Sequence, residues 1–489
     1  MRAAVAAVVA TLTLSCGGGS TAPIASGGSQ AGHGGSGHGG VNSLAGAAQG
    51  GDATTLAGRG GTSGGSAQGG SGPGGSSAGL TYWGDVAPIL ASRCLRCHQA
   101  GGIGPEILST YDSVSMQAMT ISQVVSMHIM PPWPATDDGS CGSFIGSLSL
   151  TDQEINTITT WAGGDKAEGT PVDIALPPLP TLADAVEYHT PEFTPMPEGT
   201  ALAPHDEYRC FLLDPNLTTP RYITGYDVVP GNAPMIHHVI MMQVDPTALS
   251  SDGTTTNGDK LAAMDADSPD RLGWPCFGMP GDGIEVNAVP VTWAMGQGVV
   301  TYPDSSGIPV KPTDKFVVQV HYNMGVPALV GQSDTTTIRL HWEDTVQRVG
   351  VFALHDPLLE SLSTTPVMIA SNMSSVPYTW QATVSDLGLA SLQNLKLQGV
   401  MPHMHKLGHT YSLRVMDGAS DQCGIDVKQW DIMWQRLYFY QTPFDVSAST
   451  QFQVTCDYNT MNVPPPILPG WGTSNEMCLA VLYFTADVP

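Results

Sequence analysis

The chain has 489 residues, a length typical of about three ordinary domains. Its 18 basic and 43 acidic residues give a formal net charge of −25. A surface of that sign repels nucleic-acid phosphates, so we expect no nucleic-acid partner and attribute the charge to solubility.

The first residues, MRAAVAAVVATLTLSC, place one arginine before an apolar run that ends at Cys16. This segment resembles a bacterial lipoprotein signal, which implies a lipid on Cys16. Thr13 and Leu14 depart from that pattern, and a plain secretory signal is the alternative. Both interpretations predict export, to the bacterial periplasm or the cell surface. No later segment has the roughly 18 continuous apolar residues of a membrane helix, so we expect membrane attachment only through the lipid anchor.

Residues 17–79 are dominated by Gly, Ser and Ala, with almost no aromatic or branched side chains. Such a segment cannot bury enough apolar surface to offset the entropy of ordering, so it predicts a disordered tether. His33 and His38 lie in this tether, and we expect no function for them.

Residues 94–98 read CLRCH, the C-x-x-C-H pattern of covalent c-type haem attachment. Cys94 and Cys97 are spaced to form two thioethers to the haem, and His98 is placed to reach the iron. A redox-active C-x-x-C pair or a chance match is the alternative. The motif therefore predicts one covalently bound haem c.

The residues around this motif predict helices. An apolar repeat at helical spacing precedes it, formed by Trp83, Val86, Ile89 and Leu90. A capping-box signature from Thr151 to Glu154 opens a second helix after it. The order of helix, motif, loop and helix resembles a small class I cytochrome c, which implies an all-α domain at 80–170.

The loop between these two helices is expected to supply the sixth haem ligand. The stretch SMHIMPPWP contains His128 and Met130, and the resemblance to cytochrome c favours Met130, next to the prolines. A thioether ligand holds the haem potential high and suits electron transfer, whereas His128 would lower it. A proline-rich linker is predicted at 171–190.

From about residue 185 the pattern changes to short runs rich in Val, Ile, Thr and Tyr, separated by Gly, Pro, Asn and Asp. Strands are predicted at 221–229, 237–245, 315–323, 337–342, 411–416 and 450–458. Period-2 alternation with turn signals between the runs predicts antiparallel β-sandwiches. The length fits two such units, jelly-roll-like, at 191–345 and 346–489.

Candidate metal ligands lie in these runs. His403 and His405 share one face of an extended chain and can offer two nitrogens to one metal, although a satisfied polar cluster is the alternative for such a pair. His237 and His238 are adjacent and cannot share a face, which predicts a bulge or a strand end there. The full candidate set is His237, His238, His321, His403, His405 and Met477. Imidazole combined with thioether favours copper.

In order and context, this set resembles the copper type II ascorbate-dependent monooxygenases, the family of peptidylglycine and dopamine beta-monooxygenase. The resemblance covers roughly residues 200–489 and implies two sandwich domains with one copper each. It implies an electron-transfer copper bound by His237, His238 and His321, the last in the context VQVHYN. It implies an oxygen-activating, catalytic copper bound by His403, His405 and Met477, the last in the context NEMC. The family's D-x-Y-x-C entry to the first domain is matched by Asp206, Tyr208 and Cys210.

The cysteines fit the same resemblance. It implies one disulfide between Cys456 and Cys478, which would anchor the strand of Met477, and another between Cys210 and Cys276. Cys141 and Cys423 then remain, and they either pair with each other or stay free. Disulfides also agree with export.

By this resemblance, the chain is expected to be an enzyme that uses O2 to hydroxylate a C–H bond of a small molecule. Its expected cofactors are two copper ions and one haem c, and a redox protein or small reductant would supply the haem. The haem is expected to pass electrons to the copper of His237, His238 and His321, with Gln319 on the path. The alternative is a non-catalytic periplasmic protein that transfers electrons or handles copper.

Departures from the family bear on the substrate. Met401 stands where the peptide-amidating members use an arginine to hold the substrate carboxylate, and Leu479 and Val481 replace the asparagine and tyrosine found there. Without a carboxylate clamp at these positions, a neutral or apolar small substrate is expected rather than a peptide.

Overall fold

The computed structural model describes residues 79–102, 104, 106–197, 205–295, 297–472 and 474–488. The predicted signal, Cys16 and all but the last residue of the predicted tether lie outside the described residues, as do His33 and His38. None of the helices in the described part of the chain is long and apolar enough to cross a membrane.

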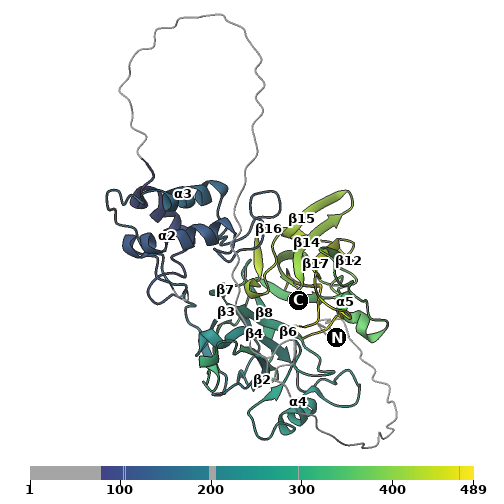
Figure 1. Cartoon of the computed structure of the whole chain (residues 1–489). Helices are drawn as coiled ribbons and strands as arrows, with labels where there is room; N and C mark the ends of the chain where they lie inside the picture. The colour runs from purple at the N-terminus through teal and green to yellow at the C-terminus, as the bar shows by residue number, and fades with distance from the viewer. Residues whose placement is uncertain are drawn as a thin grey trace, which may run out of the picture. The chain divides into compact units, whose positions relative to one another are not determined.

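The N-terminal described segment is helical. Its elements are η1 (Tyr82–Val86), α1 (Ala87–Arg93), α2 (Tyr111–Ser126) and α3 (Asp152–Gly163), and α2 and α3 lie side by side (Figure 1). The Thr151 side chain accepts a hydrogen bond from the Glu154 amide, and the Glu154 carboxylate accepts one from the Thr151 amide, so the predicted capping box begins α3. Helix α2 was not predicted, although its buried face repeats at helical spacing through Val114, Ala118, Ile121 and Val125.

The rest of the chain is mostly β-structure in three sheets. The five-stranded sheet has the order β5-β2-β9-β4-β6, formed by Trp274–Pro275, Asp206–Leu213, Lys315–Asn323, Ile236–Val244 and Ala288–Ala294. The four-stranded sheet has the order β12-β17-β14-β15, formed by Val376–Thr383, Gln451–Tyr458, Gly408–Asp417 and Ser420–Val427 (Figure 1).

A nine-stranded sheet connects the two smaller ones. Its order is β1-β10-β3-β8-β11-β18-β13-β16, and β7 pairs with β3. These strands are Val186–His189, Thr337–Glu343, Arg221–Val229, Ser306–Val310, Arg348–His355, Leu479–Asp487, Lys396–His403, Tyr438–Asp445 and, for β7, Val300–Thr301. Short helices lie between strands: η2 (Ala233–Met235), α4 (Asn257–Ala266), η3 (Pro327–Leu329), α5 (Pro357–Glu360), η4 (Ser361–Ser363) and η5 (Ile432–Trp434).

Each smaller sheet packs against one half of the nine-stranded sheet. One core joins side chains of β4 and β9, such as Val239 and Val320, to side chains of β3 and β10, such as Ile223 and Leu340. A second core joins the four-stranded sheet to β13 and β18. The two sandwiches are continuous through β8 and β11, which pair in parallel, whereas the other strand pairs are antiparallel. The expected pair of β-sandwiches is therefore present, and the nine-stranded sheet forms one layer of each.

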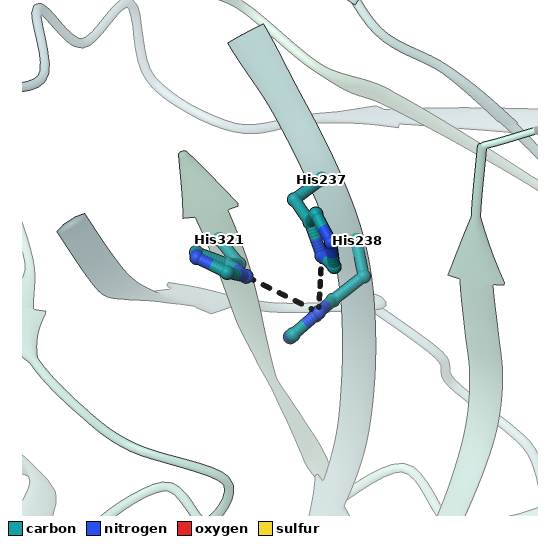
Figure 2. Close-up of side chains that lie close together, drawn as sticks. All are labelled: His237, His238 and His321. Carbon is teal, nitrogen blue, oxygen red and sulfur yellow. Dashed lines mark hydrogen bonds between the residues drawn. The ribbon is translucent and has the colours of Figure 1, made fainter. Parts of the chain in front are cut away.

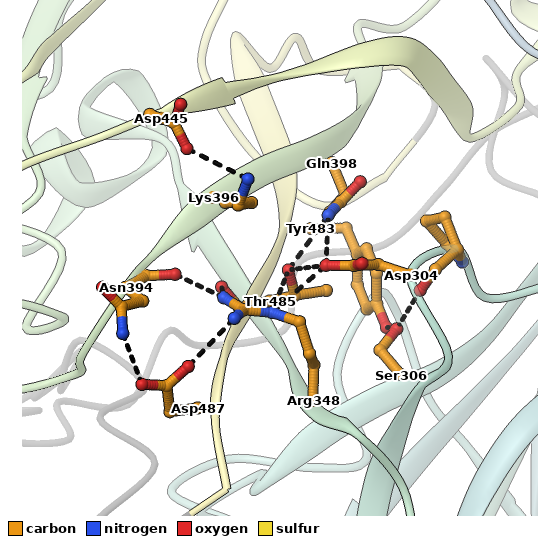
Figure 3. A network of polar contacts seen from close by, with 11 residues as sticks. Asp304, Ser306, Arg348, Asn394, Lys396, Gln398, Asp445, Tyr483, Thr485 and Asp487 are labelled. Carbon is orange, nitrogen blue, oxygen red and sulfur yellow. Dashed lines mark hydrogen bonds and ion pairs between the residues drawn. The ribbon is translucent and has the colours of Figure 1, made fainter.

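Polar contacts reinforce this junction (Figure 3). Asp304, just before β8, accepts hydrogen bonds from Gln398 of β13 at 3.1 Å and forms an ion pair with Arg348 of β11 at 3.1 Å. The hydroxyls of Ser306 and Tyr483 lie 2.6 Å apart. Because these groups belong to four different strands or their flanks, they hold the two halves of the nine-stranded sheet in one register.

The segment 133–148, between α2 and α3, packs into the C-terminal sandwich. Trp133 and Phe144 are buried in the core that contains the four-stranded sheet. A disulfide joins Cys141 to Cys423, and Phe144 forms a bridge with Tyr440 of β16. The question of these two cysteines, which the sequence left open, is answered by a bond between them. No local sequence pattern predicts that Trp133 and Phe144 contribute to this distant core.

Candidate metal centres

The first candidate site lies on two central strands of the five-stranded sheet. His238 of β4 stands directly opposite His321 of β9 in the antiparallel register. The register shifts between Ile236 and His238, so His237 is the extra residue of a bulge, as predicted from two adjacent histidines. The bulge lets both neighbouring side chains turn toward the same point.

The three imidazoles converge through their Nδ1 atoms (Figure 2). His238 Nδ1 lies 3.3 Å from His237 Nδ1 and 3.4 Å from His321 Nδ1, and one nitrogen of each ring lies within 4.8 Å of the others. Metal–imidazole bonds are about 2.0–2.1 Å, so two such nitrogens on one ion are expected roughly 3.3–3.5 Å apart. The spacing of this three-histidine site therefore fits a single metal ion.

The outer nitrogen of each ring faces a separate acceptor. His238 Nε2 lies 3.3 Å from Gln319 Oε1, and His321 Nε2 lies 3.5 Å from Asp206 Oδ1, an ion-pair distance without hydrogen-bond geometry. His237 Nε2 lies 3.2 Å from the sulfur of Met433. These partners favour the tautomer with the proton on Nε2, which leaves Nδ1 free to bind a metal.

Burial keeps these rings neutral. Desolvation lowers the pKa of His237 to about 3 and holds the pKa of His238 well below its usual value. Burial also lowers the pKa of His321, although Asp206 opposes that shift. Neutral imidazole is the form that binds a metal, so the site is ready for one without loss of a proton.

The second candidate site lies at a strand end. His403 is the last residue of β13, and its ring centroid lies 5.0 Å from that of His405. His405 Nδ1 lies 2.9 Å from the Asn475 carbonyl, and His403 Nδ1 forms a short hydrogen bond with Gln435 Oε1. Both rings therefore donate from Nδ1 and leave Nε2 free. Burial lowers the pKa of His403 to about 4 and that of His405 to about 3.

Met477 belongs to the segment that faces this histidine pair. It precedes β18, in which Leu479 pairs with His403, and only 1% of its surface is exposed. The neighbouring Glu476 carboxylate accepts hydrogen bonds from the amides of His405 at 3.0 Å and Leu407 at 2.7 Å. Burial raises the pKa of Glu476 to about 8. Glu476 thus ties the turn that bears His405 to the segment that bears Met477, a role that the sequence did not reveal.

Two disulfides lie behind the two sites. Cys210 pairs with Cys276, and the amide of Gln319 contacts the Cys276 sulfur at 3.6 Å. Cys456 pairs with Cys478, the residue after Met477. The structure forms both pairs that the family resemblance implied. The first contacts Gln319, the partner of His238, and the second includes the residue that follows Met477.

The C-x-x-C-H segment lies at the turn after α1. Cys94 and Cys97 are free thiols, and His98 Nδ1 lies 2.8 Å from the Glu106 carbonyl, which leaves Nε2 for a metal. Burial raises the pKa of Cys94 to about 12. Met130 is half-buried and His128 is exposed. Two free thiols, which can form thioethers to a haem, and an oriented imidazole, which can bind its iron, fit covalent haem attachment.

The three converging imidazoles on one sandwich, and the histidine pair near Met477 on the other, are donor types that suit copper. Residues 364–488 match the copper type II ascorbate-dependent monooxygenase, C-terminal domain. This match contains His403, His405 and Met477, so the C-terminal part of the chain is similar to the copper type II monooxygenases.

Related proteins agree with that match. The chain is 22% identical over 391 residues to dopamine beta-hydroxylase of Rattus norvegicus, covering 76% of this chain and 58% of that protein. It is 28% identical over 207 residues to tyramine beta-hydroxylase of Caenorhabditis briggsae, covering 39% of this chain and 33% of that protein. The chain thus spans less than two thirds of these relatives, and both matches support the copper monooxygenase family.

Among solved structures, the chain is similar to the major capsid protein P2 from Bacteriophage PM2. The TM-score is 0.22 at 9% sequence identity, covering 58% of this chain and 98% of that chain. A score this low carries no argument about function.

Proposed function

We propose that this chain is a copper-dependent monooxygenase that hydroxylates a C–H bond of a small substrate with O2. The observation that carries the proposal is the convergence of His237, His238 and His321 at metal-binding distances on one sandwich. His403 and His405 lie in the other sandwich together with the backbone of Met477, whose side chain packs in the core that contains β4 and β9. All three residues lie within the segment that matches the family domain.

The protein's own contribution is to hold and orient the donors. The sheet register places His238 opposite His321, and Gln319 and Asp206 orient their rings from behind. In the other sandwich, Glu476 and Gln435 fix the histidine pair, and we assign the catalytic ligand role to His403, His405 and Met477. Copper bound there would supply the redox chemistry with O2.

The helical segment is proposed as a c-type cytochrome module, covering about residues 80–170. The free thiols of Cys94 and Cys97 support this proposal, since a redox-active C-x-x-C pair needs a lowered thiol pKa and burial raises that of Cys94 here. His98 would be the proximal ligand. We propose Met130 rather than His128 as the sixth ligand, in agreement with its greater burial.

Insertion of one oxygen atom and reduction of the other to water requires two electrons beyond the substrate's own pair. A tethered one-electron carrier raises the effective concentration of the donor. We propose that the haem module supplies these electrons to the three-histidine site, and that Gln319 helps to couple that site to the space between the sandwiches. Stopped-flow mixing checks this step: reoxidation of reduced haem by the copper-loaded protein is expected, and its absence contradicts the relay.

We propose a small neutral or apolar substrate. Met401 and Val481 pair with each other on β13 and β18, next to the proposed catalytic site, and neither offers a positive charge for a carboxylate. Efficient turnover of glycine-extended peptides would contradict this assignment.

Export and a lipid on Cys16 complete the proposal. Three disulfides support an oxidising compartment. The anchor is checked by mass spectrometry of protein produced in a bacterial host, which should show a lipid-modified N-terminal Cys16 that is lost in Cys16→Ser.

The function as a whole is tested by oxygen uptake. Copper-loaded protein with a reductant and a panel of small aromatic and aliphatic substrates should consume O2 only when a substrate is hydroxylated. Copper binding without any hydroxylated product would support the alternative of an electron-transfer or copper-handling protein.

A further inference from the structure

The acceptors behind the three-histidine site come from different parts of the chain. Asp206 and Gln319 belong to β2 and β9, the same five-stranded sheet that carries the histidines. Met433 belongs to η5, in the C-terminal half of the chain, between β15 and β16. Its sulfur nonetheless lies 3.2 Å from His237 Nε2. In the described structure, Met433 is thus the one acceptor that the other sandwich supplies to these rings.

The three acceptors also differ in strength. Asp206 presents a carboxylate, Gln319 a neutral amide oxygen and Met433 a thioether sulfur, which is a weak acceptor. A metal-bound imidazole becomes a stronger donor when the proton on its other nitrogen is well accepted. His237 is therefore the weakest donor of the three by this criterion.

The position of Met433 is held by its surroundings. The Met433 amide donates to Asp431 Oδ1 at 2.8 Å, which caps η5. Two residues later, Gln435 donates its side-chain amide to the Ile432 carbonyl at 2.8 Å while its oxygen contacts His403. One short turn therefore touches a ring in each candidate metal site.

Met433 also closes a small cavity beside the three-histidine site. The cavity has a volume of about 160 Å³ and is lined in part by His237, His321, Met295, Ile432 and Met433. Its wall thus contains both the rings of one sandwich and the turn of the other.

We propose that Met433, contributed by the opposite sandwich, is a positioning residue for the three-histidine copper. As a weak acceptor for His237, it sets the reduction potential of that copper. The proposal rests on the proposed copper function. Because a thioether accepts only weakly, the contact should leave the potential of this copper below that of a ring without an acceptor and above that of a ring with an amide acceptor.

Two substitutions at one position test the proposal. Met433→Gln offers a stronger acceptor of similar size, so His237 donates more strongly and the midpoint potential of the three-histidine copper should fall. Met433→Leu removes the acceptor and weakens His237, so the potential should rise and copper affinity at this site should fall about 10-fold. Both are measured on purified copper-loaded protein by potentiometric titration followed by EPR of the Cu(II) signal.

The matched control is Met295→Leu, which changes a methionine of the same cavity that has no hydrogen bond to a ring in the described structure. Its potential and EPR spectrum should equal those of the wild type. Shifts of opposite sign in Met433→Gln and Met433→Leu, with no shift in Met295→Leu, support the proposal. Equal potentials in all four proteins, or equal shifts in the control, overturn it. A wild-type protein without copper at the three histidines instead contradicts the proposed function itself.

Discussion

The histidines of the two candidate metal sites differ in which ring nitrogen is left free for a metal. The three-histidine site lies on central strands of a sheet, and its rings point Nδ1 inward while Nε2 faces protein acceptors. The histidine pair lies at a strand end and a turn, and its rings bond to protein through Nδ1. Sheet register therefore positions the first site, whereas hydrogen bonds to a turn position the second.

This difference predicts that the two sites differ in how strongly mutations of neighbouring side chains affect metal binding. A sheet interior resists local change because many backbone hydrogen bonds fix it, but a turn depends on the few groups that hold it. In the second site those groups are Glu476, Gln435 and the Asn475 carbonyl. We expect mutations of single polar side chains to empty the second site more readily than the first.

The largest effect is expected for Glu476→Leu. The substitution leaves the buried amides of His405 and Leu407 without an acceptor, which should lower the free energy of unfolding by about 2–6 kcal/mol. Copper should be lost from the second site and retained by the three histidines. Glu476→Gln, which keeps one acceptor oxygen, should show roughly half the loss of stability. Denaturant unfolding and a copper count check both, and equal copper loss from the two sites would contradict the account.

Removing each disulfide separately distinguishes its effect on the free energy of unfolding from its effect on copper binding. The Cys210–Cys276 bond closes a separation of 66 residues and the Cys456–Cys478 bond one of 22. Loop-closure entropy predicts losses of about 4 and about 3 kcal/mol for the paired alanine substitutions. The smaller loss should nevertheless cause the greater release of copper from the second site, since Cys478 adjoins Met477. Thermal unfolding with a copper assay provides the comparison; release that follows stability alone would refute it.

A smaller effect is expected from the two glutamines that orient one ring in each site. Gln319→Leu should weaken copper binding at the three-histidine site by about 10-fold, and Gln435→Leu should weaken it at the second site by about 100-fold. Each substitution should leave the other site unchanged. Copper titration with a competing chelator measures both affinities, and crossed or equal effects would show that the sites are not oriented separately.

Local sequence patterns predicted the bulge at the three-histidine site better than the distant contacts around it. The adjacent pair His237 and His238 predicts the bulge in β4, and the predicted strand at 221–229 coincides with β3. The expected shared strand face of His403 and His405 is not formed, because β13 ends at His403 and His405 lies in the following turn. Met433 approaches His237 across 196 positions of sequence, and no local pattern marks such a contact. Partners of this kind depend on how the two sandwiches face each other.

The helical segment also makes a distant contact that local sequence patterns do not mark. The capping box predicts α3, whereas the segment expected as a loop before it contains helix α2, whose buried residues repeat at helical spacing. The burial of Trp133 in the core of the C-terminal sandwich, with the Arg436 guanidinium 4.6 Å above its ring, could not be read from local periodicity. Periodicity reveals an element but not the distant surface on which it packs.

The central claim is that the chain binds two copper ions in two chemically different sites. X-ray absorption at the copper edge of fully loaded protein tests it most directly, together with Met477→Leu. The account predicts two coppers per chain, nitrogen ligands at both and a sulfur contribution that disappears in the variant. Fewer than two coppers in the wild-type protein, or a sulfur signal unchanged by Met477→Leu, would contradict it.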